Sequence, residues 1–308
     1  MEFLDGRILW EPTLPELDAA RRARIYDEMN RVLVALHSVD VGAVGLADYG
    51  QPGSYYARQL SRWTKQYRAA ETERIEAMEE LMTWLAGRLP ADDGRVVLVH
   101  GDYRLDNLMF DATEDRIVAV LDWELSTLGH PFADLAFQCM QWRLPQGAAA
   151  LRGLGGVDRV ALGIPTEQEY VSRYCERMGI GAIPDWNFYL AMSFFRLAAI
   201  CQGVYKRGID GNASSTEASR FGEAAQPYLA KLGELAGAMG QLARNPGSPV
   251  AQEGATATAE GVQGEVNALR LAFNTAPEGA VAVGTAIEGL LRAPVRYSQS
   301  AIGGSGGS

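Results

Sequence analysis

The sequence contains no uninterrupted apolar run of about 18 residues, the length that a membrane-spanning helix needs. At the N-terminus there is no basic stretch followed by an apolar segment, so the sequence predicts no secretory signal. Both absences lead us to expect a cytoplasmic protein without a membrane partner.

Cysteine and histidine are both scarce, with three residues of each. The cysteines, Cys139, Cys175 and Cys201, are widely spaced and form no CxxC pair. Zinc sites need closely spaced Cys and His ligands, and disulfide frameworks need paired cysteines. We therefore expect neither a zinc site nor a disulfide scaffold, but three reduced, buried thiols.

Basic residues are outnumbered, because 28 Lys and Arg stand against 38 Asp and Glu, for a formal net charge of −10. Proteins that bind nucleic acid need a basic surface to meet the phosphate backbone. No nucleic-acid partner is therefore expected. The 308 residues, 47% of them hydrophobic, are enough for a buried core.

Most of the chain has apolar residues at the spacing of amphipathic helices. The first helix carries Ile25, Met29 and Leu36 on one face, with Thr13 as its expected N-cap. Residues 188–201 are apolar nearly all round, which predicts a central buried helix. Further helices are expected over 56–67, 75–85, 132–139, 171–178 and 221–235.

Short β-branched runs interrupt the helices at 95–99, 107–110 and 117–121. The polar stretch 111–115 separates the last two runs, which predicts a hairpin. The expected fold class is therefore mainly α with a small β-hairpin, an α+β arrangement.

Beyond residue 240 the composition changes. Residues 241–261 are rich in Ala, Gly, Gln, Thr and Pro, as linkers are. The chain ends at 303–308 in Gly-Gly-Ser-Gly-Gly-Ser, which is typical of an engineered linker scar. We expect residues 1–240 to form the domain and 241–308 to be a linker and a poorly ordered tail.

Three polar residues in the strand–loop–hairpin segment have the spacing of a phosphoryl-transfer site. Asp102 and Asn107 are five positions apart on a loop, and Asp122 ends the second strand of the hairpin. Phosphoryl transfer needs a carboxylate that orients the attacking hydroxyl, and hard oxygen ligands for Mg²⁺. The strand–loop–hairpin arrangement would bring all three side chains together at the mouth of one site.

The segments VHGDYRLDNLMF (99–110) and VLDWELSTLGHPFADLA (120–136) resemble the aminoglycoside phosphotransferase and choline kinase group. The chain is most similar to the kinase-like domains found alone in bacteria and fused ahead of acyl-CoA dehydrogenase domains in animals. The resemblance extends over about residues 1–237. It implies a kinase that transfers the γ-phosphate of ATP, with Mg²⁺, to a small-molecule hydroxyl, and a hydroxyacyl-CoA or another hydroxylated metabolite as its substrate.

Carried over by position, the resemblance makes Asp102 the catalytic base and Asn107 and Asp122 the Mg²⁺ ligands. Arg104, within the catalytic loop 99–110, would contact a phosphate or an acidic substrate. Glu124, the last residue of the metal strand 117–124, is a further candidate ligand.

The resemblance also implies structural and nucleotide-binding residues. His100 would brace the catalytic loop, and Asp134 would hold it by accepting backbone N–H bonds. The opening MEFLDGR (1–7) resembles the family's hinge, so Glu2, Leu4 and Asp5 are expected to meet the nucleotide.

The family's ATP site lies between two lobes, and this chain resembles only the part that follows the hinge. We therefore expect the C-terminal lobe of a protein-kinase-like fold, without the N-terminal β-lobe and its phosphate-binding Lys. One preorganised charge contact is commonly worth about 3 kcal/mol, so the isolated chain is expected to be inactive or nearly so. Self-association through the surface exposed by the missing lobe is also expected.

Two alternatives remain open at this stage. The chain could instead be a truncated, non-catalytic kinase-like fragment or interaction module. A protein kinase is disfavoured, because Trp-Glu follows Asp122 in place of Phe-Gly. Outside the catalytic loop, His130 is expected to be a helix cap or surface residue, and Arg196 to pair with an acid.

Overall fold

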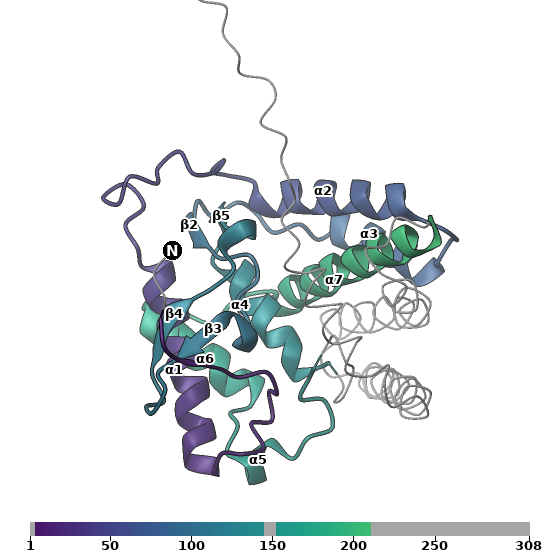
Figure 1. The fold of residues 1–308 in the computed structure, drawn as a ribbon. Helices are drawn as coiled ribbons and strands as arrows, with labels where there is room; N and C mark the ends of the chain where they lie inside the picture. The colour runs from purple at the N-terminus through teal and green to yellow at the C-terminus, as the bar shows by residue number, and fades with distance from the viewer. Residues whose placement is uncertain (1–3, 145–151, 211–308) are drawn as a thin grey trace, which may run out of the picture.

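The computed structural model describes residues 4–144 and 152–210. In this part of the chain, two small antiparallel sheets lie beside a larger set of helices (Figure 1). Glu2, the expected helix 221–235, the boundary at 240 and the tail 241–308 lie outside the described residues.

The elements follow one another along the chain with short connections. In order they are β1 (Arg7–Ile8), α1 (Ala19–His37), α2 (Tyr55–Ala70), α3 (Glu76–Ala86), β2 (Val97–Val99), the 3-10 turn η1 (Leu105–Asn107), β3 (Leu108–Phe110), β4 (Ile117–Val120), η2 (Trp123–Leu125), β5 (Thr127–Gly129), α4 (Phe132–Cys139), η3 (Met140–Trp142), α5 (Arg159–Leu162), α6 (Glu167–Met178) and α7 (Trp186–Ile209).

Helix α1 begins later than the sequence predicts. Its N-cap is Asp18, whose carboxylate accepts the Arg21 backbone N–H at 2.8 Å. The predicted cap, Thr13, instead donates its hydroxyl to the Glu11 carboxylate in the preceding turn. A short carboxylate next to the first helical residues satisfies an otherwise unpaired N–H, so Asp18 outcompetes the more distant threonine.

Helix α7 is the central helix, as predicted. It packs against α2, α3 and α4, and Figure 1 shows it running beneath α2 and α3. Among the described residues it is the one helix long and apolar enough to cross a membrane by composition, yet 72% of its apolar window is buried. Phe194, Phe195 and Ala198 are fully buried, so α7 is explained as the core helix of this fold.

The predicted hairpin is confirmed, and both sheets have a strand that the sequence analysis missed. Strand β3 pairs with β4, with Leu108 opposite Val120. Strand β1 adds to β3 with Arg7 opposite Phe110, and β2 pairs with β5 with Val99 opposite Thr127. Both missed strands have two or three residues, too few for a periodic signal.

The two sheets place the catalytic loop. The loop leaves β2 at Val99 and enters β3 at Leu108. Its two ends are therefore held by different sheets, and the start of β5 lies beside the end of β2. The helix-rich architecture with one small hairpin agrees with the expected mainly-α class, whereas correspondence to a C-terminal lobe alone stays a prediction.

Candidate active site

Asp134 ties the start of the catalytic loop to helix α4. Its side chain is fully buried, and its two carboxylate oxygens accept the backbone N–H groups of His100 at 2.7 Å and Gly101 at 2.8 Å. A buried carboxylate needs such donors, and charge-assisted bonds are among the strongest in proteins. The loop backbone is therefore held from behind, where the sequence analysis placed Asp134.

Gly101 allows the sharp turn that follows. Its φ is +85°, and a Cβ there would lie 2.5 Å from the Leu125 carbonyl oxygen. Only glycine has both the conformational freedom and the small size that this position requires. The turn brings Asp102 out of the strand and beside η2.

His100 connects the catalytic loop to the end of β4. Its ring Nδ1 lies 3.2 Å from the Asp102 backbone N–H, and its Nε2 lies 2.8 Å from the Leu121 carbonyl. Because Nδ1 must accept from an N–H, the proton is assigned to Nε2, which donates to Leu121. The buried ring also meets the Trp123 ring edge-on, with centroids 4.9 Å apart. The imidazole therefore bridges Asp102 and the residue before Asp122.

Asp102 and Asn107 are joined within the loop. The Asn107 Nδ2 donates to the Asp102 carboxylate Oδ2 and to the Asp102 carbonyl, each at 2.9 Å. The Asn107 backbone carbonyl accepts the Leu121 N–H at 2.8 Å, which connects this pair to the metal strand. Both amide hydrogens of Asn107 are thus used, and its Oδ1 is the remaining acceptor, suited to a metal ion.

Asp122 has the backbone conformation of a functional residue. Its φ of +63° lies in the left-handed region, which is unfavourable for a residue with a Cβ. It follows β4 after Leu121 and is the N-cap residue of η2. The chain therefore turns at Asp122, directly after the neighbour that His100 and Asn107 both hold.

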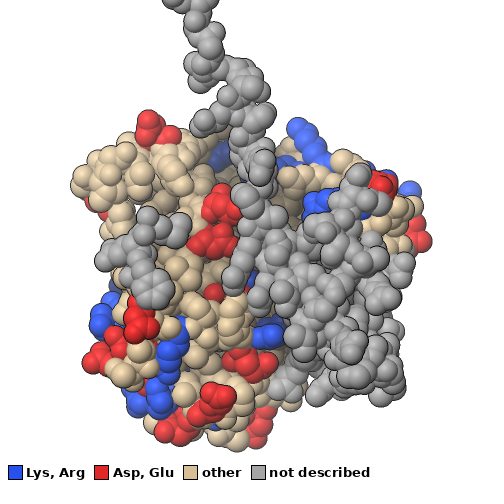
Figure 2. All heavy atoms as spheres, viewed as in Figure 1, with Lys and Arg blue, Asp and Glu red and all other residues tan. Residues whose placement is uncertain are grey.

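The mouth of the site has a negative electrostatic field. Burial raises the pKa of the Glu124 carboxyl, and the charges of Asp122 and Asp102 raise it further. In Figure 2, acidic side chains gather over the region where β2 and β5 lie in Figure 1. Carboxylates that repel one another in this way fit a site that collects a cation.

Arg104 pairs with acids of its own loop. Its Nη2 donates to the Asp106 carboxylate at 2.5 Å, and its Nε lies 3.7 Å from Asp102 Oδ1. Burial lowers the pKa of the guanidinium, but the charges of Asp102, Asp106 and Asp122 outweigh this and raise it. Among the described residues its buried Nε has no hydrogen-bond partner, which leaves one donor beside Asp102.

The described part of the expected hinge lies on the same sheet. Leu4 and Asp5 are exposed and precede β1, whose Arg7 pairs opposite Phe110. In this antiparallel register they lie toward the hairpin turn, whereas Asn107 lies at the other end of β3. The structure therefore does not bring them next to the loop acids.

Of two residues outside the loop, His130 has the first of its expected roles. It caps the entry to α4 by accepting the Phe132 N–H at 3.3 Å, and it is buried, so the surface alternative is wrong. Arg196 was expected to pair with an acid, and this is wrong for the described residues. Its guanidinium lies over the Phe137 ring at 4.7 Å and the Trp63 ring at 5.4 Å, because the surroundings of α7 offer aromatic faces in place of carboxylates.

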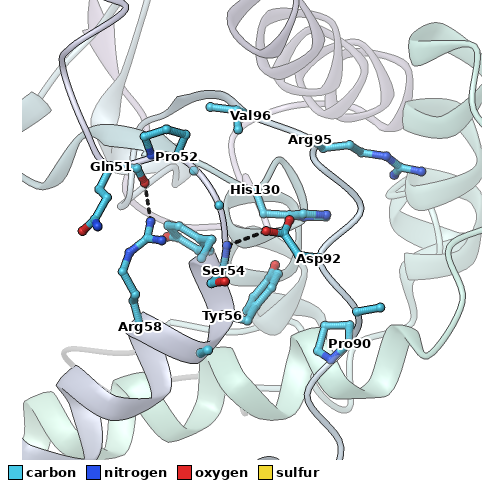
Figure 3. Close-up of a pocket in the computed structure, with 15 residues that line it drawn as sticks. Gln51, Pro52, Ser54, Tyr56, Arg58, Pro90, Asp92, Arg95, Val96 and His130 are labelled. Atoms are coloured by element: carbon cyan, nitrogen blue, oxygen red, sulfur yellow. Dashed lines mark hydrogen bonds between the residues drawn. The ribbon is translucent and has the colours of Figure 1, made fainter.

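A cavity of about 90 Å³ lies away from the catalytic loop, at the start of α2 (Figure 3). Ser54 N–H donates to Asp92 at 2.6 Å across it, and Arg58 donates to the Gln51 carbonyl. His130, at the far end of β5, forms part of the wall. This cavity is smaller than the roughly 300–1,000 Å³ of most ligand clefts, so we do not assign the active site to it.

Sequence reasoning missed His37 and Tyr174. His37 Nε2 lies 3.3 Å from the Asp134 Oδ2, and its Nδ1 lies 2.7 Å from the Tyr174 hydroxyl. Both residues are buried. The spacing of His37 from Met29 and Leu33 places it on the buried face of α1, which was an available signal, but its partners come from α4 and α6.

Among the described residues no group of three or more His, Cys, Asp or Glu side chains is arranged to hold a metal ion. An Asn and a single Asp are nonetheless a suitable protein contribution for Mg²⁺. That ion keeps several waters and is usually bound through one or two carboxylates together with substrate phosphates.

Comparison with known proteins identifies the family of this chain. The sequence profile of APH, the phosphotransferase enzyme family, matches residues 1–167. Acyl-CoA dehydrogenase family member 10 of Mus musculus is 53% identical over 223 residues, which are 72% of this chain and 21% of that protein. Acyl-CoA dehydrogenase family member 11 of Rattus norvegicus is 44% identical over 234 residues, 76% of this chain and 30% of that protein.

A solved structure is similar as well. The crystal structure of a candidate aminoglycoside phosphotransferase from Ralstonia eutropha has a TM-score of 0.72 and 52% sequence identity. The match covers 79% of this chain and 72% of that one. The resemblance inferred from residues 99–136 is thereby confirmed, while this chain spans only about a fifth to a third of the two curated relatives.

Proposed function

We propose that this chain, which belongs to the phosphotransferase enzyme family, transfers the γ-phosphoryl group of ATP to a hydroxyl group of a small molecule in a Mg²⁺-dependent reaction. The observation that carries the proposal is the paired hydrogen bond from the Asn107 amide to Asp102. It joins the expected base to an expected metal ligand inside one loop, whose backbone Asp134 holds.

Asp102 would accept the hydrogen bond of the substrate hydroxyl and take its proton. Its carboxylate is largely buried, with 15% of the side chain exposed, and it is held on one oxygen by Asn107. One carboxylate oxygen therefore remains to orient the hydroxyl. Such positioning contributes much of the rate enhancement in phosphoryl transfer.

Asn107 Oδ1 and the Asp122 carboxylate would hold Mg²⁺. These are hard oxygen donors. Burial raises the pKa of Glu124, the charges of Asp122 and Asp102 raise it further, and a cation would relieve that charge repulsion. When bound, Mg²⁺ supplies charge neutralisation to the phosphate oxygens. The Arg104 Nε has an ion-pair contact with Asp102 but, among the described residues, no hydrogen bond, and it would donate to a phosphoryl or acidic substrate oxygen.

The β1–β3 edge suits an extended nucleotide. Leu4 and Asp5 lie toward its hairpin end, and Asn107 at its other end, so the adenine and the phosphates would occupy opposite ends. We propose that the described residues correspond to the C-terminal lobe of the kinase-like fold. Exposed Leu4 and Trp10 are then the surface through which isolated chains would associate.

The substrate is proposed from the relatives. Two of them carry the name acyl-CoA dehydrogenase family member, which favours a hydroxyacyl-CoA or a related hydroxylated metabolite. The Ralstonia eutropha protein is described as a candidate aminoglycoside phosphotransferase, so aminoglycosides belong in the same test.

The test is release of ADP from Mg²⁺·ATP in the presence of hydroxyacyl-CoAs of varied chain length and hydroxyl position, with aminoglycosides as a second panel. The proposed function predicts substrate-dependent turnover that Asp102→Asn abolishes, and such turnover would overturn the inactivity expected from the sequence. The matched control is Glu80→Gln, which removes an exposed carboxylate from helix α3. Turnover that survives Asp102→Asn would overturn the assignment of the base.

The alternative is a non-catalytic kinase-like module, which would keep the fold without turnover. Thermal unfolding in Mg²⁺·ATP separates the two functions, because a ligand at 100 times its Kd stabilises by about 2.7 kcal/mol. No shift at millimolar nucleotide would support the non-catalytic module.

A further inference from the structure

We infer that His37 and Tyr174 are positioning residues for the catalytic loop, acting through Asp134. This inference rests on the proposed function only where it concerns turnover. Its structural part concerns the loop backbone itself. The three side chains come from α1, α6 and α4, and they converge on one carboxylate that holds the loop.

The hydrogen-bond directions follow from the chemistry of the groups. A carboxylate oxygen can only accept, so His37 Nε2, 3.3 Å from Asp134 Oδ2, carries the proton. His37 Nδ1 is then the acceptor, and Tyr174 donates its hydroxyl at 2.7 Å. Burial raises the pKa of Tyr174, which keeps the hydroxyl proton in place. The chain of donors thus runs from Tyr174 through His37 to Asp134.

These hydrogen bonds restrict rotation of the Asp134 carboxylate. Oδ2 receives two donors, the His100 N–H and His37 Nε2, whereas Oδ1 receives the Gly101 N–H. Without the histidine, one of the three donors is lost, and the carboxylate is freer to turn about its Cβ–Cγ bond. Both loop amides would then be held less firmly.

Tyr174 in turn fixes the imidazole. The two rings meet edge-on with centroids 5.8 Å apart and an interplanar angle of 81°. Among the described residues, the Tyr174 hydroxyl has His37 as its hydrogen-bond partner. A change on α6 can therefore reach Asp102, because the His100 and Gly101 backbone leads directly into it.

The test is backbone hydrogen exchange of the catalytic-loop peptide, measured by mass spectrometry on the full chain. We expect Tyr174→Phe and His37→Leu to speed exchange at His100 and Gly101 by about five- to tenfold, the cost of one buried hydrogen bond. His37→Gln, which retains an N–H donor for Asp134, should restore much of the protection.

The matched control is Tyr170→Phe, one turn earlier on the same helix. Its buried hydroxyl donates to Gln138 Oε1 at 2.8 Å, and no hydrogen bond joins it to Asp134. Tyr170→Phe also removes a buried tyrosine hydroxyl from α6, so it measures how much any such loss speeds hydrogen exchange in general. Equal acceleration in Tyr170→Phe and Tyr174→Phe, or no acceleration in either, would overturn the inference.

A second readout uses catalysis. With the substrate identified, Tyr174→Phe should lower kcat about five- to tenfold and leave the KM for ATP unchanged, because the loop and not the nucleotide contact is disturbed. If the wild-type chain shows no turnover, the proposed function fails, yet hydrogen exchange still decides the positioning role. If Tyr174→Phe does not fold, the comparison of His37→Gln with His37→Leu carries the same test.

Discussion

The side-chain amide of Asn107 donates to both the carboxylate and the carbonyl oxygen of Asp102, each at 2.9 Å. The two residues are five positions apart, and η1 lies between them. This contact uses both amide hydrogens, so it fixes which side of the amide presents its oxygen. The expected base and one expected metal ligand are therefore oriented by each other before any substrate binds.

That relationship predicts the behaviour of Asn107→Asp. The substitution replaces a donor with a second carboxylate facing Asp102, and like charges at this distance disfavour one another. We expect phosphotransfer to fall by about 100-fold or more, a loss of roughly 2.7 kcal/mol of transition-state stabilisation. Steady-state kinetics at saturating Mg²⁺ measures it, and unchanged kcat would show that the contact is not needed.

Gly101 and Gly94 form a matched pair for testing the loop turn. Both have positive φ, +85° and +75°, but only Gly101 has an atom in the way of a Cβ, the Leu125 carbonyl at 2.5 Å. We expect Gly101→Ala to lower the free energy of unfolding by about 3 kcal/mol and Gly94→Ala by about 1 kcal/mol. Urea denaturation measures both, and equal losses would contradict the packing argument.

Asp134→Asn should be strongly destabilising. One carboxylate oxygen becomes an NH₂ group that faces N–H donors, and the site is fully buried. Because buried donors are left unpaired, we expect the free energy of unfolding to fall by about 3 kcal/mol or more. Equilibrium unfolding in urea gives the value, and a loss below 1 kcal/mol would mean that the loop finds other partners.

Asp115 should make stability depend on pH. Its hydrogen bond with Arg21 holds the pKa of the carboxyl below its usual value, although partial burial opposes this, and Arg24 adds to the lowering. Its stabilising contribution is therefore complete above the ordinary pKa and is lost as pH falls through the lowered folded-state pKa. Asp115→Asn should cost about 1 kcal/mol at pH 7 and progressively less below about pH 4.

The control for this prediction is Asp48→Asn, at an exposed loop carboxyl. We expect the Asp48→Asn variant to unfold as the wild type does at each pH. Chemical denaturation between pH 3 and pH 7 makes the comparison. A deficit for Asp115→Asn that stays constant over this range would rule out the ionic origin.

Glu124→Gln tests the negative field at the mouth. Burial raises the pKa of Glu124, and the charges of Asp122 and Asp102 raise it further, so the charged form of the carboxyl is disfavoured there. Removing that charge should raise Tm by on the order of 1 °C without metal at neutral pH. The advantage should disappear in excess Mg²⁺, because the cation then compensates the wild-type charge. A gain that does not depend on Mg²⁺ would argue against a metal site here.

Local sequence determined the chemistry-bearing elements. The hairpin could be predicted because β3 and β4 are contiguous and separated by a polar turn. The helices α2 and α3 could be predicted because their apolar residues keep a helical period, and α7 because its segment is apolar nearly all round. The positions of Asp102, Asn107 and Asp122 followed from short spacings, which local backbone geometry converts directly into proximity.

Only the tertiary structure decided what supports those residues. The His37–Asp134 contact spans 97 positions and the His37–Tyr174 contact spans 137. Strands β1 and β5 are too short to leave a periodic signal, and each forms only by pairing with a strand elsewhere. Arg196 faces aromatic rings on two other helices. Contacts of this kind depend on how helices and sheets pack, so neither periodicity nor spacing along the chain could reveal them.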